Sequence, residues 1–138
     1  MIGVVVISRE PAGLLVVDAA NVVGSRPDGW WRDRAGAAER LVGRITAAVA
    51  DGVDPDLRER RVVVVLEGAA RAASSEGHDD VEVVLAYGSG DDAIVAVVAA
   101  SPDDAVVVTS DRELRRRVEA LGAQCRGAGW LWGRLDRA

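Results

Sequence analysis

The stretch that decides the fold is Gly13–Val23, GLLVVDAANVV. The apolar residues Leu14–Val17 run without a break into Asp18, and Asn21 follows three positions later. A short, continuous run of valine and leucine predicts a strand that is buried on both faces, as in a parallel sheet covered by helices. A carboxylate is costly to remove from water unless it is paired or binds a metal. The acid at the end of this strand therefore marks a candidate site.

The composition predicts one globular domain, residues 1–138, with an aliphatic core. Hydrophobic residues make up 49% of the chain but aromatic residues only 4%, so valine, leucine and alanine must fill that core. The single cysteine, Cys125, excludes an internal disulfide and favours a reducing compartment. Met1–Ile7 lacks the basic segment and cleavage site of a signal peptide. No apolar run reaches the ~20 residues that a membrane span needs, so we expect a cytoplasmic protein that does not bind membranes.

The charge balance restricts the kind of nucleic-acid binding that the chain can perform. All 17 basic residues are arginines, and the net charge is −5. This charge argues against a protein that coats nucleic acid without specificity. It leaves open an enzyme that holds nucleic acid through a local arginine patch.

Apolar runs and helical periodicities alternate along the chain. Strands are predicted at Gly13–Asp18, Val62–Leu66, Val81–Tyr87, Ala105–Val108 and Ala123–Arg126, with a candidate edge strand at Ile2–Ile7. Helices are predicted from the cap Asp33 to about Ala50, over Ala93–Ala100 with Asp91 and Asp92 in its first turn, and over Arg112–Leu121. The connecting segments are a loop at Val22–Asp33, a charged connection at Asp51–Arg61, a short helix or loop at Gly68–Asp80, and a tryptophan-containing tail. This alternation predicts a three-layer α/β/α sandwich around a mainly parallel sheet of about five strands, a Rossmann-like architecture.

Acidic residues follow several of these strands directly. Asp18, Glu67 and Asp111 each end an apolar run, and Asp91 and Asp92 come just after the third strand. Because the carboxyl ends of parallel strands meet at one edge, these acids are expected to converge there. Carboxylates brought close together raise one another's pKa values. Oxygen ligands without histidine or cysteine suit Mg²⁺ or Mn²⁺.

Four segments carry a resemblance to a known family. They are VVDAANVVGSRPDGWWRD, VVVVLEG, GSGDDAI and VVVTSDREL, which together span about Leu14 to Gly122. The chain resembles the NYN branch of the PIN-like nuclease superfamily, close to its YacP-like bacterial members. It departs from their pattern at Glu67, where relatives usually have aspartate, and at Gly90, where they have alanine before the acidic pair.

The resemblance implies metal-dependent hydrolysis of phosphodiester bonds, usually of RNA, in a PIN-like fold. By this interpretation Asp18, Asp91 or Asp92, and Asp111 hold one or two Mg²⁺ or Mn²⁺ ions, and Glu67 is a further ligand or a base that positions water. Asp18, Glu67, Asp91 and Asp111 are the candidate catalytic residues.

The candidate substrate contacts surround these acids. Asn21 can hold a ligand carboxylate or the phosphate, and Ser110 and the amides at Arg112 can contact a phosphate oxygen. Arg26, Arg32, Arg34 and Arg112 are candidate contacts to backbone phosphates. Trp30 and Trp31 either pack the loop against the domain or stack on a base, and packing is the favoured interpretation.

Several alternatives remain open. One of the pair Asp91 and Asp92 can be a helix cap only, and Asp111 can cap the helix that follows it. A PIN-like module without catalytic activity that binds RNA or a protein partner is a second function, and a nucleotide pyrophosphohydrolase with the same metal site is a third. A receiver domain needs a lysine that this chain lacks. A Rossmann nucleotide-binding domain would need a Gly-x-Gly-x-x-Gly after the first strand. The tail Trp130–Trp132 is a candidate contact in a homodimer.

Overall fold

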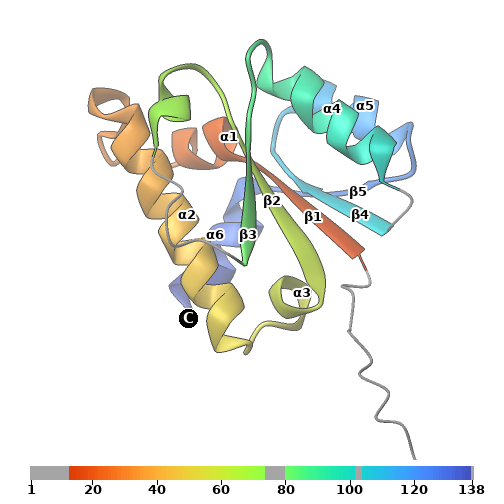
Figure 1. Cartoon of the computed structure of the whole chain (residues 1–138), viewed down its shortest axis with the longest axis horizontal. Helices are drawn as coiled ribbons and strands as arrows, with labels where there is room; N and C mark the ends of the chain where they lie inside the picture. Colours follow the sequence, from red (N-terminus) through yellow and green to blue (C-terminus); the bar gives the residue numbers. More distant parts are fainter. Residues whose placement is uncertain (1–12, 74–79, 102–103, 138) are drawn as a thin grey trace, which may run out of the picture.

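The computed structural model describes residues 13–73, 80–101 and 104–137, in which strands and helices alternate along the chain (Figure 1). The strands are β1 (Gly13–Asp18), β2 (Arg60–Leu66), β3 (Val81–Leu85), β4 (Asp104–Val108) and β5 (Gln124–Arg126). The α-helices are α1 (Ala19–Gly24), α2 (Arg34–Asp51), α3 (Pro55–Arg58), α4 (Gly90–Ala100), α5 (Arg112–Glu119) and α6 (Ala128–Asp136). Two 3₁₀ helices complete the set, η1 (Trp30–Arg32) and η2 (Gly68–Ala72).

The strands form one sheet in the order β3-β2-β1-β4-β5, and every pair of neighbours is parallel. The chain builds β2 and β3 on one side of β1 and then returns to build β4 and β5 on the other side. In open α/β sheets, ligands bind outside the carboxyl ends of the strands where the strand order reverses. That position lies between the ends of β1 and β4.

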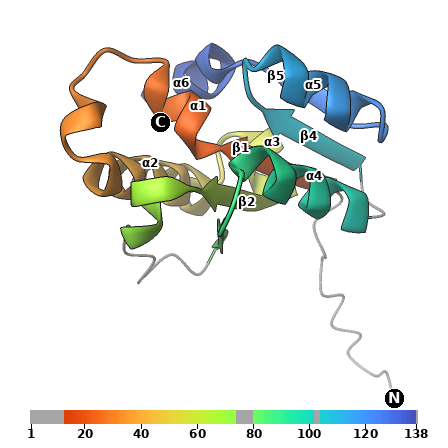
Figure 2. The ribbon, with the colours of Figure 1, turned by 90° about the horizontal axis from the view of Figure 1, so that it is seen from above.

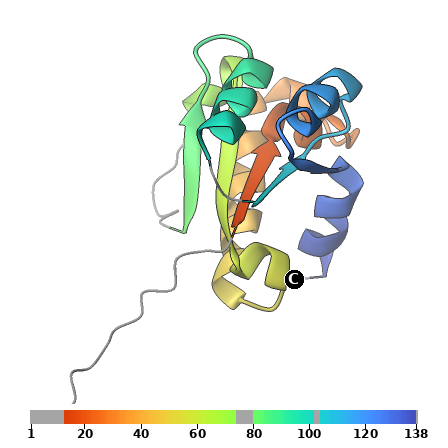
Figure 3. The ribbon, with the colours of Figure 1, turned by 90° about the vertical axis from the view of Figure 1, so that its right-hand side faces the viewer.

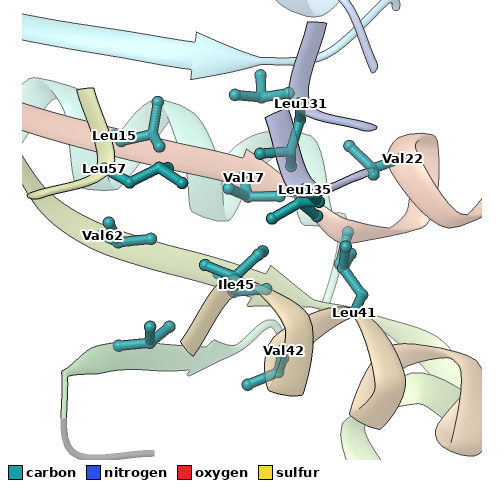
Figure 4. Close-up of a cluster of buried hydrophobic side chains, with 14 of the residues drawn as sticks. Leu15, Val17, Val22, Leu41, Val42, Ile45, Leu57, Val62, Leu131 and Leu135 are labelled. Atoms are coloured by element: carbon teal, nitrogen blue, oxygen red, sulfur yellow. The ribbon is translucent and has the colours of Figure 1, made fainter. Parts of the chain in front are cut away.

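The sheet is covered on both faces, because alternate strand residues point to opposite sides. Leu15 and Val17 of β1 pack with α1, α2, α3 and α6, and Figure 4 shows side chains of this cluster. Leu14 and Val16 pack with α4 and α5 on the other face. In Figure 3, α4 lies in front of the strands and α2 behind them. The predicted α/β sandwich with a parallel sheet of five strands is confirmed.

Local signals placed most of the elements correctly. Asp33 caps α2, since its side chain accepts a hydrogen bond from the N–H of Gly36 at 2.9 Å. The strand predicted over Val81–Tyr87 is shorter than expected, because β3 is an edge strand that ends at Leu85 and leaves Tyr87 exposed. The candidate edge strand at Ile2–Ile7 lies outside the described residues.

Two predicted connections contain helical turns instead of loops alone. Val22 lies in α1, a helix of 6 residues that Asp18 caps. Burial of Val22 in the core stabilises this short helix. The loop predicted at Val22–Asp33 also contains η1, and α3 interrupts the charged connection at Asp51–Arg61. In α3, Asp54 is the cap and proline occupies the first turn, a local signal that the sequence interpretation passed over.

The tail is a helix, which the sequence interpretation missed because Gly129 and Gly133 lower its intrinsic helix propensity. Tertiary packing overrides this preference, since Leu131 and Leu135 of α6 are buried in the core. Trp130 and Trp132 are partly buried against the same core, so the tail is less exposed than expected. The homodimer contact at the tail stays a prediction. None of the described helices is both long enough and apolar enough to cross a membrane.

Candidate functional site

Acidic side chains from β1, β2, α4 and α5 gather at the carboxyl edge of the sheet, the side on which α1 follows β1 in Figure 2. Asp18 is the last residue of β1, Glu67 follows β2, Asp91 lies in the first turn of α4, and Asp111 precedes α5. Asp91 and Glu67 both act on the pKa of Asp18, and Asp111 and Glu67 act on the pKa of Asp91. The acids that the sequence predicted to converge are therefore electrostatic neighbours.

Asp18 is the most buried of these acids, with 6% of its surface exposed. Its Oδ1 accepts a hydrogen bond from the N–H of Asn21 at 3.3 Å, and its Oδ2 accepts one from the hydroxyl of Thr109 at 2.9 Å. Burial raises the pKa of Asp18 from 3.8 to about 6, against the opposing effect of both hydrogen bonds and with a smaller contribution from Asp91 and Glu67. Its side chain is thus held in one position while its charge is destabilised.

Thr109 is a site residue that sequence reasoning missed. It is fully buried, donates to Asp18 and accepts a hydrogen bond from the N–H of Asp111 at 3.1 Å. Because one hydroxyl donates to the carboxylate of Asp18 and accepts from the backbone of Asp111, Thr109 fixes the end of β4 relative to the end of β1. The available signal was the position of threonine between an apolar strand and two polar residues.

Asn21 and Ser110 were both predicted to contact a ligand, and in the structure they form a hydrogen bond with each other. The N–H of Ser110 donates to the side-chain oxygen of Asn21 at 2.8 Å. The hydroxyl of Ser110 accepts from the N–H of Ala128 at 3.1 Å, which ties the start of α6 to the site. Both residues therefore join the loop after β4 to its neighbours in addition to any contact with a ligand.

Glu67 reaches across to α4. Its Oε2 accepts a hydrogen bond from the N–H of Gly90 at 2.7 Å, at the first residue of the helix. A Cβ at position 90 would lie 2.8 Å from the side-chain carbon Cδ of Glu67, closer than such atoms normally approach. Glu67 and Gly90, the positions at which the chain departs from the sequence pattern that it resembles, are therefore in direct contact.

Asp91 and Asp92 occupy different environments. Burial and the neighbours Asp111 and Glu67 raise the pKa of Asp91. Asp92 is exposed and forms an ion pair with Arg117 of α5 at 2.8 Å. Neither is the cap of α4, since Ser89 takes that position. The expectation that Asp91 or Asp92 caps the helix is wrong, because the side chain of Ser89 accepts a hydrogen bond from the N–H of Asp92.

Asp111 caps α5, with its Oδ1 accepting from the N–H of Leu114 at 2.9 Å. Arg112 is exposed at the start of that helix. Arg32 and Arg34 are exposed in and beside η1, with their guanidinium groups 5.8 Å from the ring centre of Trp31 and 5.4 Å from that of Trp30. Arg26 differs from these, because it pairs with Asp136 at 2.6 Å and stacks on Trp132.

The chemistry of these acids fits a hard divalent cation, since all donors are carboxylate oxygens whose mutual repulsion a cation would relieve. Among the described residues, no three histidine, cysteine, aspartate or glutamate side chains form a group that could hold a metal as they stand. Asp18, Glu67 and Asp111 each direct at least one oxygen to a protein donor.

Comparison with known proteins shows the fold of this chain. No protein-family model and no curated protein sequence matches it. The crystal structure of Rae1 (YacP) from Bacillus subtilis matches with a TM-score of 0.71 at 20% identity, over 90% of this chain and 74% of that one. A tryptophan-to-leucine mutant of the same protein matches with a TM-score of 0.68 at 21% identity, over 91% and 76%. The chain thus has the PIN-like fold of Rae1 (YacP).

Proposed function

We propose that this chain is a metal-dependent ribonuclease that hydrolyses phosphodiester bonds at the edge formed by Asp18, Glu67, Asp91 and Asp111. The observation that carries the proposal is the electrostatic coupling of acids from four separate elements, in a PIN-like fold. Repulsion between carboxylates destabilises the site unless a cation neutralises it. A protein has little structural reason to gather such charges at one edge, so a role in binding a cation explains them best.

In this proposal Asp18, Asp91 and Asp111 hold Mg²⁺ or Mn²⁺. When bound, such an ion neutralises charge on a phosphate and lowers the pKa of water. Asp91 is preferred over Asp92 because Asp92 is paired with Arg117 and more exposed. Thr109 is a positioning residue, since it contacts both Asp18 and the backbone of Asp111.

We assign Glu67 a positioning role, in place of the metal ligand or water-positioning base that the sequence suggests. Its hydrogen bond to Gly90 anchors the first turn of α4, the turn that carries Asp91. Glu67 therefore positions Asp91 and adds negative charge to the edge. Arg32, Arg34 and Arg112 are exposed and are proposed to contact the RNA backbone, while Asn21 and Ser110 shape the loop after β4. Arg26 is left out of this set because of its ion pair with Asp136.

The decisive experiment compares Asp91→Asn with Asp92→Asn in cleavage of a labelled, structured RNA, with Mn²⁺ or Mg²⁺ and with EDTA. Loss of a residue that supports the metal removes several kcal/mol of transition-state stabilisation, so Asp91→Asn is expected to lose at least about a hundredfold in rate. Asp92→Asn is the matched control, since it makes the same change one residue away, and should keep most of the activity. Equal loss in both variants would contradict the choice of Asp91.

A second candidate is a PIN-like module without catalytic activity that binds RNA or a protein. The hydrogen bonds that Asp18, Glu67 and Asp111 already accept from protein donors favour it, since they give these carboxylates a structural role. Isothermal titration with Mn²⁺ separates the two functions. Binding that is lost in an Asp18→Asn/Asp111→Asn double variant supports the nuclease, whereas no binding to the wild-type protein supports the inactive module.

A further inference from the structure

A cavity of about 380 Å³ opens beside the acidic edge, in the size range of ligand-binding pockets. Its walls come from α1, η1, α2 and η2, which surround one end of β2. Its lining includes Val23, Trp30, Arg34, Ala38, Glu67 and Ala70, and we call this cavity the base pocket. We propose that the base pocket binds a nucleobase of the nucleic-acid substrate, next to the phosphate that the acidic edge attacks. The position of that phosphate rests on the proposed nuclease function.

The walls of the base pocket suit a flat and uncharged group. Val23, Ala38 and Ala70 provide an apolar surface, and Trp30 provides an aromatic ring. The guanidinium of Arg34 lies over that ring, 5.4 Å from its centre. Proteins hold unpaired bases by stacking them on aromatic rings. The apolar wall and the ring of Trp30 meet in this cavity, and Arg34 lies beside them at the start of α2.

The charges in the base pocket argue for a base and against a phosphate. Glu67 and Arg34 both line the cavity, so the negative charge of one offsets the positive charge of the other and the wall carries no net positive charge to attract an anion. A base, by contrast, offers N–H groups to which a carboxylate can bind, and acidic side chains accept from the amino group of cytosine in this way. One carboxylate has about four lone-pair positions, so the bond from Gly90 to Oε2 leaves Glu67 able to accept another. Bases with an amino group are therefore preferred over uracil.

Glu67 also fixes where the bound nucleotide lies. The same carboxylate lines the base pocket and contributes to the raised pKa values of Asp18 and Asp91. A base in the pocket is thus in the immediate neighbourhood of the acids. The pocket and the acidic edge can therefore hold one nucleotide between them.

Small residues keep the cavity open. Ala19 and Ala20 of α1, with Gly68 at the start of η2 and Gly88 between β3 and α4, complete its walls, and larger side chains at these positions would reduce it. Gly68 has a φ of +58°, a left-handed conformation that favours glycine, so the turn itself helps to define the wall.

The first experiment needs neither metal nor phosphate, so it is independent of catalysis. Adenosine, cytidine, guanosine and uridine are titrated to millimolar concentrations into the ¹⁵N-labelled protein, and the indole N–H resonances of its four tryptophans are followed. Tryptophan-to-phenylalanine variants assign them. The resonance of Trp30 is expected to move more for adenosine, cytidine and guanosine, which carry an amino group, than for uridine, while that of Trp132 stays in place. No movement of the Trp30 resonance with any nucleoside overturns the proposal.

The second experiment compares Trp30→Ala with Trp31→Ala in RNA cleavage. Trp31 is the matched control, because it lies edge-to-face with Trp30 at 6.0 Å, is 51% exposed and does not line the base pocket. Loss of one stacked base is expected to raise KM about tenfold in Trp30→Ala, with a much smaller change in Trp31→Ala. Equal changes in the two variants overturn the proposal. If nucleosides move the Trp30 resonance but the wild-type protein cleaves no RNA, the nuclease function fails and the base pocket stands.

Discussion

Asp18 combines two demands that conflict at the scale of a single residue. Its side chain is buried and bonded to Thr109, which holds it in one position, yet burial raises its pKa to about 6. A buried carboxylate is more stable as the neutral acid. The site therefore carries a cost in stability at neutral pH when no cation is bound.

This cost predicts a pH-dependent effect of Asp18→Asn on the metal-free protein. The folded-state pKa of Asp18 is raised from 3.8 to about 6, so its contribution to stability is complete below pH 3.8 and is lost as the pH rises through 6. The asparagine side chain carries no charge, and the variant is expected to be more stable than the wild type by about 2–3 kcal/mol at pH 8, with the difference vanishing near pH 4. Urea unfolding in EDTA at both pH values measures it. A difference that does not change with pH would show that burial of the Asp18 charge is not its cause.

We predict that substitutions at Gly90 and Glu67 have coupled effects on the free energy of unfolding. The Cβ of Gly90→Ala would displace the carboxyl group of Glu67, the far end of a flexible side chain, and weaken its hydrogen bond to the N–H of residue 90, so we expect a loss of about 1 kcal/mol in the free energy of unfolding. The shorter side chain of Glu67→Asp leaves space for that Cβ, so the double variant should be more stable than the sum of the two single losses predicts, by about 0.5–1 kcal/mol.

The control for this cycle is Gly43→Ala in α2, where no atom lies within 4 Å of the added Cβ. That change should stabilise the protein by about 0.5–1 kcal/mol, since alanine favours a helix. Urea unfolding of the wild type, the two single variants and the double variant measures the coupling energy. Simple additivity would show that the contact does not explain the two departures from the family pattern.

At the scale of elements, α6 holds α1 in place. The indole N–H of Trp132 donates to the carbonyl of Val22 and to the hydroxyl of Ser25, each at 3.0 Å. Arg26 and Arg44 lie over the Trp132 ring, 4.0 and 5.5 Å from its centre, and both pair with Asp136. Hydrogen bonds from Arg44 and Arg26 keep the pKa of Asp136 below its ordinary value. Since α1 directly follows Asp18, this contact supports the acidic edge from outside.

Trp132→Ala is therefore expected to lower the free energy of unfolding by about 2–4 kcal/mol, because ring packing and two hydrogen bonds are lost. Trp132→Phe keeps a ring but removes the N–H, and should cost about 1 kcal/mol. Chemical denaturation of both variants tests the order. A loss in Trp132→Phe as large as in Trp132→Ala would assign the contact to the hydrogen bonds alone.

At the scale of the whole molecule, the net charge of −5 limits how RNA can be held. Arg32, Arg34 and Arg112 are the exposed arginines proposed to contact phosphates. Three such contacts to single-stranded RNA predict a slope of log K against log salt of only about −2. Binding affinity measured from low to high potassium chloride tests this value, and Arg112→Ala should reduce the slope by about one contact. A much steeper slope would mean that other arginines take part.

The sequence by itself determined the layers of the molecule and the positions of the acids. Buried strands of valine and leucine have to lie inside an α/β sandwich, and parallel strands bring the residues after them to one edge. Asp18, Glu67, Asp91 and Asp111 could be predicted together for this reason. The signals involved are local, since each acid directly follows its own strand or begins the helix after it.

Only the tertiary structure decided which partners these residues have. Arg26, a candidate phosphate contact, pairs in the folded protein with Asp136, 110 residues further along the chain. Thr109, the contact of Glu67 with Gly90, the helix α6 and the base pocket likewise depend on segments that are distant in the sequence. A local pattern records whether a residue favours a strand, a helix or a cap. The free energy of a side chain in the folded protein depends instead on burial and on neighbours from other elements, which exist only after packing.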